Sequence, residues 1–284
     1  MQENWYGKYL GEFIGTYLLC FFGLGAVFVA VYIGLFKDLL PVMWLWGFAV
    51  AIAVYVGAAV SGAHFNPSVT IALAVWKGFP WRQVPAYLVS QVAGAFCAAV
   101  TLWVLFQGFA APFEAANKLV RGQFGSQLSG MVFSCYIPNP AIVGFTPEAY
   151  AKVPLYVGFL SEFIGTALLF IMILVLLEER NGLRPHSSLF PLALAVVVFA
   201  VVALTAPLSM ASLNGARDLG PRVLAYLLGW GEMAFPGPRG EFWILTVAPI
   251  IGAVFGGFLY EKIILPLYPA ASQGASAKQN DVPA

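Results

Sequence analysis

Two short polar segments stand inside a strongly apolar sequence, at residues 64–70 (HFNPSVT) and 212–218 (SLNGARD). Each segment places an asparagine, Asn66 or Asn214, directly before a tripeptide that can start a helix. An asparagine amide can donate a hydrogen bond to a neutral oxygen, and a helix N-terminus carries partial positive charge. Two such breaks, 148 positions apart, therefore favour a polar path built from a duplicated unit.

The composition indicates a membrane protein. The 284 residues are 61% apolar and 10% charged, with a mean hydropathy of +0.84, and long apolar runs of this kind are typical of transmembrane helices. The net charge is +1, which argues against a nucleic-acid partner. Non-helical backbone is costly at membrane depth unless it is buried in protein or lines a polar cavity. Both asparagine segments must therefore be enclosed.

Six apolar runs are long enough to cross about 30 Å of hydrocarbon, which takes roughly 20 helical residues. They cover residues 9–34, 40–60, 85–106, 156–177, 189–207 and 242–264. Two shorter runs, 67–76 and 215–228, directly follow the asparagines and are too short to span. We expect these two to be re-entrant half-helices whose ends meet protein rather than lipid.

The two halves of the sequence repeat each other. The hexapeptide at 11–16 (GEFIGT) returns 150 positions later at 161–166 (SEFIGT), and each half reads as span, span, half-helix, span. Three spans is an odd number, so the second half must enter the membrane upside down. The expected fold class is an all-α membrane protein with six transmembrane helices and two re-entrant half-helices in an inverted repeat.

We expect a single channel domain over residues 1–268, with repeats at about 1–110 and 155–265. An external connection at 108–154 would join them, and a small, polar tail at 269–284 would be disordered. Basic residues show a weak bias that places both termini in the cytoplasm of a multi-pass protein of the cell membrane. The inside segments would carry Lys8, Lys77, Arg82, Arg180, Arg184, Lys262 and Lys278, and the longer outside segments Lys37, Lys118, Arg121, Lys152 and Arg239.

If both half-helix N-termini meet at the membrane midplane, their positive ends repel cations and protons while the amides still bind neutral oxygens. A coupled carrier is an alternative, because inverted repeats also build carriers. A carrier usually needs a titratable relay, and the ionisable candidates within the spans and loops are only Glu12, Glu162, His64, Arg217 and Asp218. A structural membrane protein with a closed pore would leave the duplicated polarity unexplained. No nucleophile–base set or metal cluster appears in the spans, so we expect no enzyme, no metal and no cofactor.

The chain resembles the aquaporin superfamily, and within it the glycerol facilitators, along nearly its whole length. The segments that carry the resemblance are 60–70 (VSGAHFNPSVT), 214–222 (NGARDLGPR), 90–96 (SQVAGAF), the run ending at 229–231 (GWG) and both Glu-Phe-Ile-Gly-Thr segments. In that family the glycerol-conducting branch is marked by an acid after the filter arginine, a basic residue four further on, and a proline–aliphatic pair in the last span. Asp218, Arg222, Pro249 and Ile250 match that pattern.

The resemblance implies a role for each matching position. Asn66 and Asn214 would donate to the permeating hydroxyl, and Arg217 would be the donor of the external selectivity filter, with Trp46 as its apolar wall. Glu12 and Glu162 would be buried and hold the re-entrant loops. The acceptor ladder would be formed by the carbonyls of Gly62, Ala63, His64, Met210, Ala211 and Ser212. His64 could equally be a residue that packs the loop. The solute would be glycerol or a related polyol, with water, and the assembly in the lipid bilayer would be a homotetramer.

Five positions depart from the family pattern. Ser68 replaces an alanine and Gly215 a proline in the two motifs, and Met210 replaces a glycine, which could alter the backbone path of the second loop. In the selectivity filter, Val202 and Ala211 align with the usual glycine and phenylalanine. Losing a phenyl ring opens the filter near Arg217, and gaining a valine partly refills it from another side. Propanediol, dihydroxyacetone and urea are therefore alternative solutes.

Overall fold

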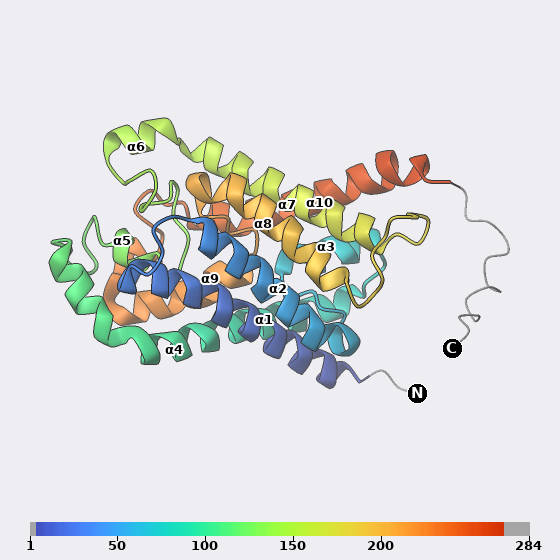
Figure 1. Ribbon diagram of the computed structural model, residues 1–284, viewed down its shortest axis with the longest axis horizontal. Helices are drawn as coiled ribbons and strands as arrows, with labels where there is room; N and C mark the ends of the chain where they lie inside the picture. Colours follow the sequence, from blue (N-terminus) through green and yellow to red (C-terminus); the bar gives the residue numbers. More distant parts are fainter. Residues whose placement is uncertain (1–3, 270–284) are drawn as a thin grey trace.

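Six long apolar helices form the bundle in the computed structural model, which describes residues 4–269 (Figure 1). Each is long and apolar enough to cross a membrane, which confirms the six predicted spans. They are α1 (Trp5–Phe28), α2 (Leu40–Ser61), α4 (Val84–Ala116), α7 (Leu155–Leu177), α8 (Phe190–Ser209) and α10 (Phe242–Leu259). Further helical turns extend α1 through Ile33 and α10 through Leu267. The predicted tail at 269–284 lies, apart from Pro269, outside the described residues.

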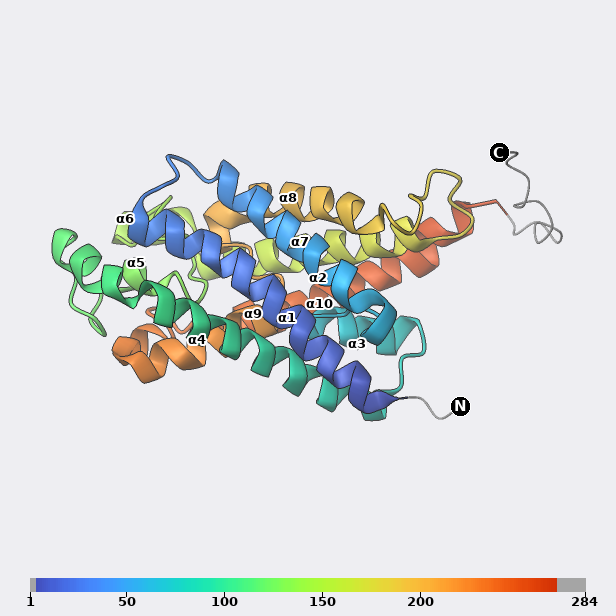
Figure 2. The ribbon, with the colours of Figure 1, turned by 60° about the horizontal axis from the view of Figure 1, so that its bottom comes forward.

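Two short helices occupy the interior of the bundle between α4 and α10. They are α3 (Pro67–Trp76), toward the end where the chain begins, and α9 (Gly215–Ala225), toward the opposite end (Figures 1 and 2). Asn66 and Asn214 are their N-cap residues, as the sequence predicts. The helix α9 ends at Ala225, three residues before its predicted end at residue 228. A π-helical turn then continues through Trp230.

The helix α4 runs ten residues past its predicted end at 106. Its last turns are held because Glu114, only 8% exposed, accepts hydrogen bonds from Arg121 and Ser129 at 2.9 Å each. The predicted 108–154 connection is therefore partly helical, since it also contains α5 (Gln127–Gly130) and α6 (Pro147–Lys152).

The two halves cross their helices at equivalent points. A Cβ added to Gly94 of α4 would lie 2.3 Å from the Phe13 carbonyl oxygen of α1, and one on Gly252 of α10 would lie 2.2 Å from that of Phe163 in α7. Only glycine allows backbones to approach this closely. The duplicated crossings fix the position of α1 and α7, which carry Glu12 and Glu162.

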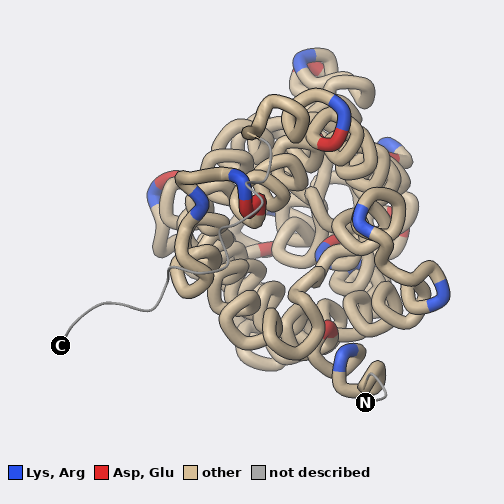
Figure 3. Tube along the Cα trace, turned by 90° about the vertical axis from the view of Figure 1, so that its right-hand side faces the viewer, with Lys and Arg blue, Asp and Glu red and all other residues tan. Residues whose placement is uncertain are grey.

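Charged residues are few along this fold, as the view down the long axis shows (Figure 3). Several are nevertheless deeply buried: Glu12, Glu162, Asp218 and Arg222 are 0% exposed and Arg217 is 2% exposed. Ionisable groups buried at membrane depth are costly and mark function or essential internal pairing. The loops before α3 and α9 are therefore the candidate functional region.

The residue before each asparagine anchors its loop against α1 or α7. Phe65, 2% exposed, fills a gap left by Gly15 and Gly57, and Leu213 fills the equivalent gap beside Gly165. A Cβ on Gly15 would lie 2.0 Å from the Phe65 ring. The small residues are therefore required by the shape of the loop and not only by helix packing.

The Gly15→Ala variant should be destabilised by about 1–3 kcal/mol, because the added methyl overlaps the Phe65 ring. The measurement is the loss of monodisperse protein on heating in detergent, followed by size-exclusion chromatography. Gly108→Ala is the matched control, since a Cβ there meets nothing within 4 Å. Adding Phe65→Leu should restore part of the loss in Gly15→Ala. Equal melting of the two alanine variants would contradict this packing.

Candidate functional site

The two asparagine segments meet in the interior and bond to each other. The Asn66 Nδ2 donates to the Leu213 carbonyl at 2.8 Å, and the Asn214 Nδ2 donates to the Phe65 carbonyl at 2.8 Å. Each side-chain oxygen meanwhile accepts from the first turn of its own half-helix, from Ser68 at 2.9 Å and from Ala216 at 3.0 Å. Each amide group retains a second N–H, which is available to a solute.

Two buried glutamates hold the loops. Glu12 accepts from the His64 and Phe65 N–H groups at 3.0 and 2.7 Å. Glu162 accepts from the equivalent N–H groups of Ser212 and Leu213 at 2.8 and 2.7 Å. Both carboxylates thus accept hydrogen bonds from the loops that precede the half-helices. With these N–H groups directed at the carboxylates, the loop carbonyls are left to bond elsewhere.

Sequence reasoning did not assign the residues that complete the first glutamate site. Ser61 donates to Glu12 at 2.6 Å, and Gln91 donates to Glu12 at 2.7 Å and to Thr70 at 2.9 Å. All are buried. An uncharged polar residue in the middle of the apolar run 85–106 was the available signal for Gln91, because such a group needs a partner there.

Both loops have the same left-handed backbone. The φ values are 58° at Ala63 and 50° at Phe65, and 52° at Ala211 and 50° at Leu213. Met210, with φ of 60°, takes the conformation of its counterpart Gly62, with φ of 87°. The methionine therefore does not divert the backbone, although a left-handed non-glycine residue costs about 1–2 kcal/mol.

Two cavities meet at the predicted selectivity filter. An inner cavity of about 90 Å³ is lined by Asn66, Asn214, Ala63, His64, Ala211 and Ser212 together with apolar side chains. An outer cavity of about 470 Å³ lies beyond it and includes Met210. Trp46, Val202 and Arg217 line both cavities, so they form the junction. Gly62 lines neither cavity and is exposed.

Arg217 has an unused donor at this junction. Its guanidinium carbon lies 4.7 Å from the centre of the Trp46 ring, and its Nη1 is buried without a hydrogen-bond partner among the described residues. A buried charged donor left unpaired costs free energy. A solute or water oxygen in the cavity would satisfy it.

His64 both lines the inner cavity and packs the loop. Its ring centre lies 4.7 Å from that of Phe79 and 5.0 Å from that of Tyr87, and its Nδ1 lies 3.2 Å from the Thr70 hydroxyl oxygen. The two alternatives that the sequence left open for His64 are therefore compatible.

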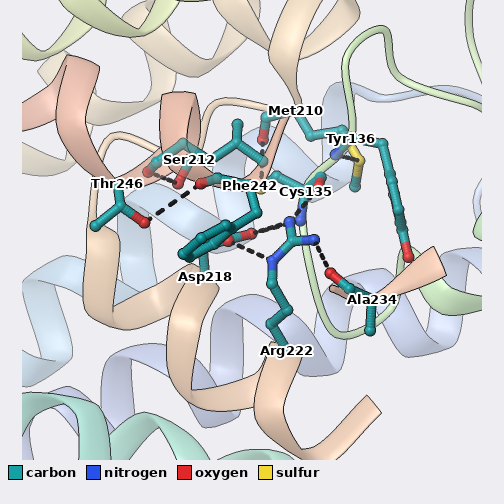
Figure 4. A network of polar contacts seen from close by, with 10 residues as sticks. Cys135, Tyr136, Met210, Ser212, Asp218, Arg222, Ala234, Phe242 and Thr246 are labelled. Carbon is teal, nitrogen blue, oxygen red and sulfur yellow. Dashed lines mark hydrogen bonds and ion pairs between the residues drawn. The ribbon is translucent and has the colours of Figure 1, made fainter. Parts of the chain in front are cut away.

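Asp218 and Arg222 form a buried ion pair behind the pore loop (Figure 4). Arg222 donates to Asp218 at 2.7 and 3.0 Å, and to the Ala234 and Cys135 carbonyls at 2.7 and 2.6 Å. Asp218 in turn accepts from the Cys135 N–H at 2.7 Å. The pair therefore ties α9 to the external connection and lines neither cavity.

Pro249 also has a structural explanation. A proline has no N–H to donate to the carbonyl four residues earlier, so it leaves the Leu245 carbonyl unpaired in α10. The Ser212 hydroxyl donates to that carbonyl at 3.1 Å, which fastens the second pore loop to α10.

Glu241 and Glu178 are two of the carboxylates outside the spans that have shifted pKa values. Burial raises the pKa of Glu241, which directly precedes α10. Burial opposes ionisation of Glu178 as well, but hydrogen bonds from Tyr260 and Arg180 outweigh it and lower its pKa to about 2. Neither residue lines the inner or the outer cavity.

The inverted repeat and the paired asparagine loops define a channel-forming membrane protein with two re-entrant half-helices. The chain belongs to the major intrinsic protein family, whose model matches residues 1–260. It is 39% identical over 280 residues to the glycerol uptake facilitator protein of Pseudomonas aeruginosa, covering 98% of this chain and 95% of that protein. It is 40% identical over 260 residues to that of Escherichia coli K12, covering 91% and 88%.

The chain also matches a relative named for a different solute, and it matches a solved structure. The propanediol uptake facilitator of Citrobacter freundii is 36% identical over 266 residues, covering 93% of this chain and 94% of that protein. The X-ray structure of the aquaglyceroporin from Plasmodium falciparum superimposes with a TM-score of 0.79 at 28% identity, covering 93% of this chain and 98% of that one. The expected fold and family are confirmed.

The Arg222→Met variant should lose about 3–5 kcal/mol of stability, because it leaves the buried Asp218 carboxylate unpaired. The measurement is thermal unfolding in detergent. Arg184→Met is the control, since that side chain is 47% exposed and its partner Glu179 is 86% exposed, and such pairs contribute about 0–1 kcal/mol. A double variant that adds Asp218→Leu should recover part of the loss. An Arg222→Met protein as stable as the control would overturn this role.

Proposed function

We propose that the chain is a passive channel for small uncharged polyols, foremost glycerol, and for water. The observation that carries the proposal is the reciprocal hydrogen bonding of Asn66 and Asn214, which places two amide donors on one enclosed cavity. Glycerol is the foremost proposed solute because two of the relatives are glycerol uptake facilitators and the structural neighbour is an aquaglyceroporin.

In the proposed path a solute passes from the outer cavity through the filter formed by Trp46, Val202, Ala211 and Arg217. The free N–H of Arg217 donates to a hydroxyl while Trp46 and Val202 contact the carbon backbone. Such a filter binds one polar and one apolar edge of the solute, which suits a polyol. The guanidinium charge also repels cations and protons.

Beyond the filter, Asn66 and Asn214 are the proposed donors and the loop carbonyls the proposed acceptors. Ala63, His64, Ala211 and Ser212 line the inner cavity and would form the central part of the acceptor ladder. Gly62 and Met210 would be its outermost members. Glu12 and Glu162 are positioning residues, because they contact the loops and not the path.

The first alternative keeps the same pore and changes the solute. A propanediol uptake facilitator is among the relatives. Val202 and the small Ala211 are apolar residues on the wall of the inner cavity that Arg217 also lines. 1,2-Propanediol carries a methyl group where glycerol carries a hydroxymethyl group, so an apolar wall would favour it. Dihydroxyacetone and urea are the further candidates.

We place the protein in the plasma membrane, as its bacterial relatives and six spans suggest, with both termini in the cytoplasm. A homotetramer is proposed from the family resemblance. Labelling of single cysteines at 37 and 184 from either side of intact cells would test the orientation, and light scattering of the purified protein would test the assembly.

Reconstituted liposomes test the channel directly. Under glycerol and propanediol gradients, light scattering should report flux well above that of bare lipid, with sorbitol slower and with no effect of a protonophore. Protonophore-sensitive uptake would support the coupled carrier instead. Flux no higher than that of lipid alone would support a closed pore.

The Ala211→Phe variant should narrow the filter, because a ring replaces a methyl on the cavity wall beside Arg217. Flux of a five-carbon polyol should fall about tenfold relative to glycerol, which is the lower end of the discrimination that one extra methylene group can give. Ala115→Phe is the control, since that position is exposed at the end of α4. Unchanged relative rates for the two solutes would contradict the proposed filter.

A further inference from the structure

An apolar groove runs along the outside of the bundle between α4 and α10. Its volume is about 540 Å³, and it is separate from the two cavities of the proposed path. Leu88, Val89, Val92 and Phe96 of α4 form one wall. The floor is formed where α3 and α9 begin, at Pro67 and Gly215. Gly215 deepens the groove, because it lacks the ring that its counterpart Pro67 carries.

The groove lies within the hydrocarbon layer. Taking Trp81–Ala116 as the span, and a rise of about 1.5 Å per residue, the groove residues 88–97 lie roughly 9–22 Å from Arg82 along the helix. The hydrocarbon core is about 30 Å thick. The one polar side chain in the lining, Thr246, donates to the Phe242 carbonyl of its own helix. At this depth such a groove can be filled by an acyl chain or by another apolar protein surface.

A basic and an aromatic residue mark the membrane-interface end of the same helix. Trp81 is 58% exposed, and Arg82 is exposed without an ion pair or hydrogen bond among the described residues. Exposed tryptophan and arginine at a span end are typical of the headgroup level. Val89 and Phe96 lie seven residues apart, on one face of α4, and Arg82 lies in the short 3-10 turn (Trp81–Gln83) that leads into this helix.

We propose that this face is a phospholipid site. The guanidinium of Arg82 binds the phosphate of an anionic lipid, and one acyl chain lies in the groove and ends against Pro67 and Gly215. The combination favours a lipid over a second protein copy, because an exposed cation at headgroup depth lies about 9 Å along the helix from a groove lined almost entirely by apolar side chains. The chain end then contacts the first turns of α3 and α9, opposite the side on which Asn66 and Asn214 line the pore.

Photocrosslinking tests the site. The full chain is reconstituted in phosphatidylcholine vesicles with phosphatidylglycerol as the minor lipid, which carries a diazirine in its acyl chain. After illumination, mass spectrometry of the peptides should find label concentrated at residues 88–97 of α4 and the first turn of α9. Label spread evenly along the lipid-facing side of α4, including residues 104–109, would overturn the proposal.

Matched variants separate the groove from the surface in general. Val89→Trp fills the groove and should lower the groove label to the level of the surrounding helix, whereas Val104→Trp should not. The two valines are 69% and 62% exposed on the same helix. Unchanged elution from a size-exclusion column shows that each variant is folded. Undiminished groove label in Val89→Trp, or a protein–protein crosslink through the groove without lipid label, contradicts the site.

The proposed contact between Arg82 and the lipid headgroup is tested separately. Arg82→Gln should lower groove labelling by phosphatidylglycerol about fivefold, since one basic residue near a membrane surface contributes on that order. Labelling by a diazirine phosphatidylcholine should change little. Equal phosphatidylglycerol labelling in Arg82→Gln and the unmodified chain would show that Arg82 does not bind the headgroup.

Discussion

The bonding of each pore asparagine to the opposite loop is the interaction on which the rest of the site depends. Asn66 and Asn214 each join their own half-helix through the side-chain oxygen and the other loop through the nitrogen. Neither half can place its donor without the other, so the inverted repeat is a geometric requirement of the site. Replacing either asparagine removes a cap and a cross-link together.

The loops that hold these asparagines are strained and need support from both sides. Left-handed residues recur at equivalent positions such as Phe65 and Leu213, and each costs roughly 1–2 kcal/mol. On one side, each loop gives two N–H groups to a buried glutamate; on the other, Phe65 or Leu213 fills a gap beside a glycine. The strain is useful because it exposes successive carbonyls, which a regular helix would have paired internally.

Much of the fold follows from the sequence because its signals are periodic and repeated. Six apolar runs, two N-capping asparagines and the duplicated Glu12 and Glu162 segments predict the elements and the hydrogen bonds that both acids accept from the loops. The sequence did not predict the length of α4, which depends on Glu114 meeting Arg121 and Ser129 through the tertiary fold. Gln91 was missed for the same reason, since a single polar residue does not identify its partner.

The two halves differ at the residues that follow the asparagines, and this difference produces the polarity of the pore. Thr70 and Asp218 each lie four positions after their asparagine. Thr70 accepts a hydrogen bond from the uncharged Gln91 side chain, whereas Asp218 forms an ion pair with Arg222 at 2.7 Å. Because Arg222 neutralises Asp218, the acid does not neutralise the adjacent Arg217, whose Nη1 keeps no partner among the described residues. The second half therefore keeps one uncompensated positive charge at the junction of the two cavities, while the first half stays uncharged there. An inverted repeat that is symmetric in backbone thus carries an asymmetric distribution of charge, which in the proposed channel would place the barrier to cations at one end.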